Sequence, residues 1–97
     1  PRIYFGNSRF LHNCFERLGP HIKSCHAKDI TLAEQLTVHL SEVRIGLGRL
    51  NYATFLREMK KLDPDTPLML EHLPNAEDYL AAAAHVRAVA KAEGIEL

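Results

Sequence analysis

The chain has 97 residues, 46% of them hydrophobic, and its 12 basic residues balance its 12 acidic ones. This size and composition fit one small globular domain, and the absence of a basic block or an acidic tail argues against nucleic-acid binding and against disorder. No apolar run approaches the roughly 18 residues that cross a membrane, and no charged-then-apolar leader is evident, so we expect a cytoplasmic protein. Cys14 and Cys25 have no disulfide-framework spacing, and we interpret them as buried, reduced thiols.

Three stretches of the chain carry the apolar periodicity of amphipathic helices. The first covers residues 10–18, with Asn7 or Ser8 as the N-cap and Gly19-Pro20 as the stop. The second covers residues 52–62, capped by Asn51 and ended by the sequence Asp-Pro at 63–64. The third runs from about residue 76 to residue 93 and stops at a glycine, with the tyrosine at position 79 and the alanine run 81–84 expected in the core.

Two apolar runs of four residues, 22–25 and 67–70, are too short for helices and are bounded by proline and charged residues. We expect two buried strands, apolar on both faces as in a parallel sheet. The predicted order is helix, strand, long loop, helix, strand, helix. Strand, helix and strand then form a right-handed βαβ unit, which places the chain in the α/β class.

Residues 27–50 form a connection of about 24 residues, where α/β loops usually have two to six. It leaves the carboxyl end of the first strand, the edge at which α/β folds place their active sites. We expect it to cover that edge with little regular structure beyond a helical turn near residues 32–36. Its Gly46-Leu47-Gly48 turn indicates a positive φ and is too short a match for a dinucleotide-binding fingerprint.

Both predicted strands end on ionisable residues, the first at His26 and the second at Glu71. Neighbouring parallel strands lie about 5 Å apart, so we predict that these side chains converge to within about 10 Å. An imidazole and a carboxylate so placed are two of the three or four ligands that a catalytic metal ion needs. The residues alone leave open that both side chains simply bind loop backbone. Lys28 and Asp29 fit a surface ion pair.

The segments LGPHIKSCHAKDI, HLSEVRIGLGRLNYATFLREM and DTPLMLEHL, in this order and spacing, resemble the last third of the sugar phosphate isomerase/epimerase family. These proteins are xylose isomerase-like (β/α)₈ barrels, a group that also includes apurinic endonucleases. The resemblance covers nearly the whole chain. It implies that residues 1–97 are the C-terminal portion of a TIM barrel, from its sixth helix through its seventh strand and helix to its eighth strand and helix, with parallel strands. The start at Pro1 agrees with a fragment.

The resemblance also implies roles for single residues. His26 matches a metal ligand, and Glu71 matches a glutamate that binds the metal and acts as a catalytic acid/base. Arg44 lies near a position that contacts substrate, and His39 falls where the endonuclease branch has further metal ligands. The chain departs from the family where it has GLG followed by Asn51 instead of GEG followed by aspartate, which weakens the match for substrate contacts from this loop.

The implied function is a metal-dependent isomerase or epimerase of a sugar or related polyol. A divalent ion such as Mn, Mg, Co or Zn would chelate neighbouring carbonyl and hydroxyl oxygens, and two glutamates, one of them Glu71, would move the proton. One alternative is an apurinic endonuclease-like phosphodiesterase, which the neutral charge disfavours. Another is a non-catalytic truncated fragment. We expect the 97 residues to be inactive alone and poorly stable as a monomer. In the isolated chain the outer edges and one face of the two strands lack partners, so exposed apolar patches should drive association into a homo-oligomer or partial unfolding.

Overall fold

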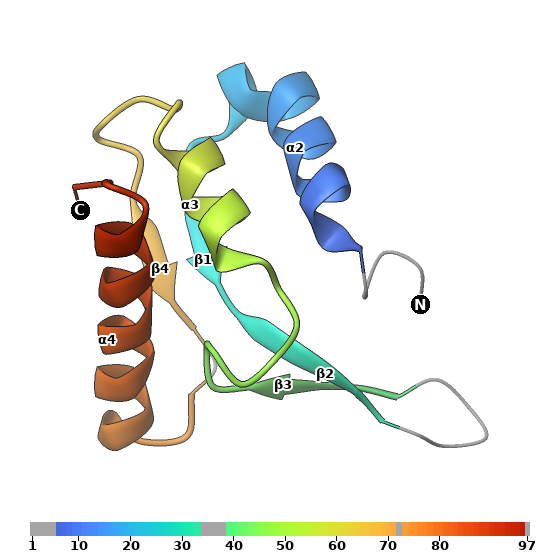
Figure 1. Cartoon of the computed structure of the whole chain (residues 1–97), viewed down its shortest axis with the longest axis vertical. Coiled ribbons are helices and arrows are strands. Elements are labelled where there is room, and N and C mark those ends of the chain that lie inside the picture. The colour runs from blue at the N-terminus through green and yellow to red at the C-terminus, as the bar shows by residue number, and fades with distance from the viewer. Residues whose placement is uncertain (1–5, 34–38, 72, 97) are drawn as a thin grey trace.

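The computed structural model describes residues 6–33, 39–71 and 73–96, which form a mixed α/β structure. Figure 1 shows helices α2, α3 and α4 side by side, with strands β1 and β4 lying against them and the β2–β3 hairpin extending away. No helix of the described residues is long and apolar enough to span a bilayer. The described residues combine helices with a small parallel sheet, which confirms the α/β class predicted from the sequence.

All three predicted helices are present: α2 (Asn7–Leu18), α3 (Tyr52–Met59) and α4 (Ala76–Ala92). The Asn51 side chain caps α3 by accepting a hydrogen bond from the Thr54 amide, as predicted. After α4, Gly94 takes the positive φ of 69° that favours glycine at a helix end. These two helix ends follow from local chemistry, which is why the sequence predicts them. The other end of α3 is at Met59, before the predicted residue 62.

The predicted N-cap of α2 is wrong, because Gly6 occupies that position and Asn7 is the first helical residue. The Asn7 side chain is buried and serves a longer-range contact. It donates to the Arg49 carbonyl and accepts from the Asn51 amide, both at 2.8 Å. A polar side chain that suits a cap is thus used to tie α2 to the start of α3.

Strands β1 (Cys25–Ala27) and β4 (Leu68–Leu70) pair in parallel, with His26 opposite Met69. The second strand lies where it was predicted. The first starts three residues later than the predicted residue 22, because the short 3₁₀ helix η1 (Gly19–His21) precedes it and pairing begins only near Cys25. The Cys25 amide donates to the Pro67 carbonyl at 2.9 Å. His26 therefore lies within the strand.

The two faces of this parallel pair differ: one is covered, and the other lacks a partner among the described residues, as expected for the isolated chain. Ala27 is buried in the core, and Cys25, Leu68 and Leu70 pack against it. His26 and Met69, which alternate with them, are exposed. One face of the sheet thus contacts the helices, while the other presents a histidine and a methionine.

Residues 27–50 contain a β-hairpin in place of the predicted loop. Strands β2 (Asp29–Ala33) and β3 (His39–Val43) pair antiparallel from Asp29 opposite Val43 to Ala33 opposite His39. The predicted helical turn near residues 32–36 is wrong at 32–33, which are strand, and its remainder lies outside the described residues. The backbone hydrogen bonds between β2 and β3 pair N–H and C=O groups that a long irregular loop would leave to solvent. This pairing is the physical reason why a hairpin forms instead of a loop.

The core is centred on α3, whose Tyr52, Phe55 and Leu56 are buried. Phe15 of α2 meets Phe55 edge-to-face at a centroid distance of 5.9 Å. On α4 the small residue at position 82 is fully buried, as the alanine run suggested, but Tyr79 is 38% exposed and is not a core residue. Cys14 and Cys25 are free thiols and only partly buried, and burial raises the pKa of Cys25.

Candidate functional site

His26 and Glu71 meet at the carboxyl end of the parallel strand pair. His26 is the middle residue of β1, and Glu71 directly follows β4. The His26 Nδ1 atom lies 2.9 Å from the Glu71 Oε2 atom, so the predicted convergence of the two side chains is confirmed. Both remain accessible, with 47% of the His26 side chain and 28% of the Glu71 side chain exposed. A small ligand can therefore reach the pair.

Lys28 and Glu42 extend this pair into a row of four charged or ionisable groups. Lys28 Nζ lies 3.4 Å from Glu71 Oε2 and 3.3 Å from Glu42 Oε1. We name His26, Lys28, Glu42 and Glu71 the strand-end cluster. Burial lowers the pKa of Lys28, but the hydrogen bonds and negative charges of Glu42 and Glu71 outweigh it, so the net shift is upward.

The sequence indicated a surface ion pair between Lys28 and Asp29, and it assigned no role to Glu42. The signal that it missed is the hairpin register, in which Glu42 lies opposite Ile30. That register brings β3 back beside the start of β2, two residues from Lys28. A strand prediction for residues 29–33 and 39–43 would have found the contact, whereas an irregular loop hides it.

The contact between His26 Nδ1 and Glu71 Oε2 has an ordinary hydrogen-bond distance, and the same distance also suits two neighbouring ligand atoms of one divalent cation. Metal–ligand bonds of about 2.0–2.2 Å place neighbouring ligands of an octahedral ion about 3 Å apart, close to the observed 2.9 Å. Imidazole nitrogen and carboxylate oxygen suit Mn, Co and Zn, and the carboxylate suits Mg. Within residues 6–33, 39–71 and 73–96, no group of three His, Cys, Asp or Glu side chains is arranged to hold a metal ion. The side chain of His39 lies outside the described residues.

Asp29 is buried, with 2% of the residue exposed, so it is not half of the surface ion pair that the sequence suggested. Its carboxylate accepts four backbone hydrogen bonds. Oδ2 accepts from the amides of Gly46 and Gly48 at 3.0 and 3.1 Å, and Oδ1 accepts from those of Ile30 and Leu50 at 3.0 Å. Asp29 thus organises the chain between β3 and α3.

Close approach requires both glycines of the GLG turn, and conformation also requires the first of them. Gly46 has a φ of 101°, as the sequence predicted, and a Cβ there would lie 2.9 Å from the His85 ring. A Cβ at Gly48 would lie 2.2 Å from Asp29 Oδ1 and 2.4 Å from the Ile30 carbonyl oxygen. The turn therefore packs directly against the buried Asp29 carboxylate, although Gly46 and Leu47 themselves are exposed.

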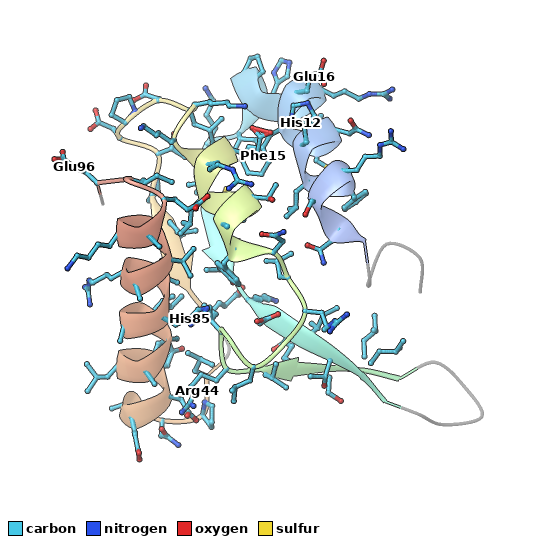
Figure 2. All side chains as sticks on the ribbon, viewed as in Figure 1. His12, Phe15, Glu16, Arg44, His85 and Glu96 are labelled. Carbon is cyan, nitrogen blue, oxygen red and sulfur yellow. The ribbon has the colours of Figure 1, made fainter. Side chains whose placement is uncertain are left out.

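His85 and Tyr52 enclose this turn from the helix side. The two rings meet edge-to-face at a centroid distance of 6.4 Å, and the Tyr52 hydroxyl donates to the Lys28 carbonyl. Burial, followed by the negative charge of Asp29, raises the pKa of Tyr52. The sequence assigned no role to His85, and the structure makes it a packing residue against Gly46 (Figure 2).

Arg44 lies on the same segment but pairs elsewhere. Its Nη1 atom is 3.4 Å from Oδ1 of Asp78, in the first turn of α4. In the described residues the structure joins His26 to Glu71, but it does not join Arg44 to either of them. The substrate-binding role of Arg44 therefore stays a prediction from the resemblance.

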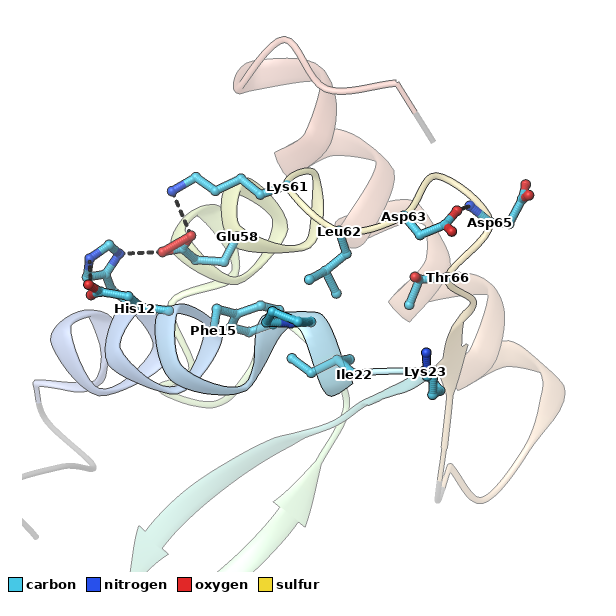
Figure 3. A pocket seen from close by; sticks show the side chains of 13 residues that line it. His12, Phe15, Ile22, Lys23, Glu58, Lys61, Leu62, Asp63, Asp65 and Thr66 are labelled. Atoms are coloured by element: carbon cyan, nitrogen blue, oxygen red, sulfur yellow. Dashed lines mark hydrogen bonds and ion pairs between the residues drawn. The ribbon is translucent and has the colours of Figure 1, made fainter.

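A second polar group lies near the amino ends of β1 and β4, beside a pocket of about 630 Å³ (Figure 3). Glu58 of α3, with 6% of its side chain exposed, lies 2.8 Å from Lys61 Nζ and 2.5 Å from His12 Nδ1. The hydrogen bond from Lys61 is the largest cause that lowers the pKa of Glu58; burial opposes it and His12 adds to it. This group links α2 to α3 and lies outside the strand-end cluster.

No family model matches the chain, and no characterised protein or solved structure is significantly similar to it. The resemblance to the sugar phosphate isomerases and epimerases therefore rests on the sequence motifs alone. The geometry of the strand-end cluster has to support any functional assignment.

Proposed function

We propose that this chain forms the C-terminal part of a (β/α)₈ barrel enzyme, a metal-dependent isomerase or epimerase that acts on a sugar or related polyol. The observation that carries the proposal is the His26–Glu71 pair, 2.9 Å apart at the carboxyl end of two parallel strands. This is the end at which barrel enzymes build their active sites. Both residues are those that the motif resemblance assigns to the metal.

The exposure of the parallel strands gives further support. The face that carries His26 and Met69 points away from the helices and is open in this chain. In a closed barrel the equivalent face lines the interior, while helices cover the outside. A histidine on that face and a glutamate after the next strand then contribute to one central site.

In the proposed reaction Glu71 exchanges a proton with the substrate carbon that lies between a carbonyl and a hydroxyl group. A bound divalent ion would supply the positive charge that stabilises the resulting enediolate oxygens. Together, His26 and Glu71 would hold the ion, and Arg44 would bind substrate oxygen atoms in exchange for Asp78. The remaining ligands and the second acid/base would come from strands that precede this chain in the barrel.

The proposal is tested by Glu71→Gln in the complete barrel protein. Deuterium incorporation from D₂O into a panel of ketoses should fall by about 10² to 10⁴, the usual contribution of a general acid–base group. Glu16→Gln, which removes an exposed glutamate on α2 that pairs with His12, is the matched control and should retain activity.

If the Glu71→Gln enzyme incorporated deuterium at the wild-type rate, Glu71 would not be the acid/base of the reaction. Cleavage of abasic DNA, with no exchange of any ketose, would favour the phosphodiesterase alternative. A complete barrel that does neither would match a non-catalytic role.

A further inference from the structure

His12 of α2 lies between two carboxylates that come from different helices. Its Nδ1 atom is 2.5 Å from Oε1 of Glu58 on α3 (Figure 3). Its Nε2 atom is 3.3 Å from Oε2 of Glu16, one turn further along α2. An ionised carboxylate only accepts hydrogen bonds, so both contacts are satisfied only when each ring nitrogen has a proton. The positions of the three side chains therefore fit the charged imidazolium form of His12.

The helix that carries His12 buries little apolar surface. Of the residues of α2, all of which the structure describes, only Asn7 is buried. Leu11 and Phe15 pack against the core but remain partly exposed. Because the hydrophobic effect is roughly proportional to the apolar area removed from water, it holds α2 weakly, and polar contacts to α3 matter correspondingly more.

We propose that the protonation of His12 controls how firmly α2 is attached to α3, with the firmest attachment where His12 is charged and Glu58 is ionised. The contact is a pH-sensitive link between two helices. This inference does not depend on the proposed metal site, because His12 and Glu58 lie beside the pocket near the amino ends of β1 and β4. His26 and Glu71 meet at the opposite, carboxyl end of these strands.

The charged groups around His12 set the direction of the pH dependence. Lys61 Nζ, 2.8 Å from Oε2 of Glu58, is the first cause that lowers the pKa of Glu58, so this carboxylate stays ionised where histidines titrate. Above that range, at about pH 6 to 7, His12 has one N–H and no charge, and either Glu58 or Glu16 loses its donor. The link is therefore present at pH 6 and lost as the pH rises. Further charged groups line the same pocket: Lys23, Asp63 and Asp65.

The test is urea denaturation of the 97-residue chain at pH 6 and at pH 8.5, followed by far-UV circular dichroism. His12→Gln removes the charge and keeps a neutral polar side chain. It should raise the unfolding equilibrium constant about two- to fivefold at pH 6, the range of partly exposed ion pairs, and less than about 1.5-fold at pH 8.5. His21→Gln, which removes an exposed histidine on η1, is the matched control and should have the same effect at both pH values.

Two double variants decide whether the link joins the helices or acts within α2 alone. In a Glu58→Gln background the pH-dependent effect of His12→Gln should vanish, because the partner on α3 is neutral. In a Glu16→Gln background most of the effect should remain, because Glu16 is exposed and lies on the same helix as His12. The reverse pattern would show a local effect within α2 and would overturn the inference.

Hydrogen exchange of the α2 amides, corrected for the pH dependence of the intrinsic rate, is a second measurement that needs no complete unfolding transition. Protection of α2 relative to α3 should fall about two- to fivefold between pH 6 and pH 8.5 in the wild type, and less in His12→Gln. Equal protection of α2 at both pH values, including no protection at either, would overturn the inference and leave the role of Glu71 untouched.

Discussion

Asp29→Asn should strongly destabilise the fold although the two side chains have nearly the same shape. The carboxylate accepts from four amides, two on each oxygen. An amide side chain has one oxygen, so its NH₂ group must face either the pair Gly46 and Gly48 or the pair Ile30 and Leu50. Two N–H donors that face this buried side chain then lose their acceptor, at about 1–3 kcal/mol each if little water reaches them, which gives a loss of up to about 2–6 kcal/mol.

This loss is large even beside the total stability of about 5–15 kcal/mol of an ordinary complete domain. The assay is urea denaturation followed by far-UV circular dichroism, with a lowered midpoint and an unchanged slope. Asp63→Asn is the matched control, because Asp63 is exposed and its carboxylate accepts one backbone hydrogen bond, from Asp65 at 2.9 Å; its cost should stay below about 0.5 kcal/mol. A loss below about 1 kcal/mol for Asp29→Asn would refute the reasoning.

Two further predictions concern the helices. Because the folded-state pKa of Glu58 is depressed, its ion pairs stabilise the fold above the unfolded-state pKa and are lost as the pH falls through the folded value. Lys61→Met should therefore lower the unfolding free energy at pH 7, by up to about 1 kcal/mol, and the difference should shrink between about pH 5 and pH 3; a difference independent of pH would contradict this. Asn51→Ala should cost about 1–2 kcal/mol in the same assay, and Asn75→Ala less, because Asn51 caps α3 and also donates to Ser8, whereas Asn75 caps the exposed end of α4. An equal or reversed order would argue against the tie between α2 and α3.

The elements that depend on neighbours in the chain were predictable from the sequence. The three helices follow from apolar periodicity and from caps such as Asn51 and Gly94. The convergence of His26 and Glu71 was also predictable, because strands joined by a helical crossover run parallel and end at the same edge. Both kinds of inference need only the local pattern and one rule of chain geometry.

The tertiary structure alone decided what Asp29, Lys28 and Glu42 do. An aspartate beside a lysine looks like a surface pair, yet Asp29 is buried and binds amides that lie 17 to 21 residues away. The hairpin was missed because strand pairing depends on a partner segment, which the pattern of a single short segment does not contain. The physical reason is the same in each case: a helix forms its backbone hydrogen bonds within itself, whereas strands and buried carboxylates form theirs with residues that only the folded chain brings near.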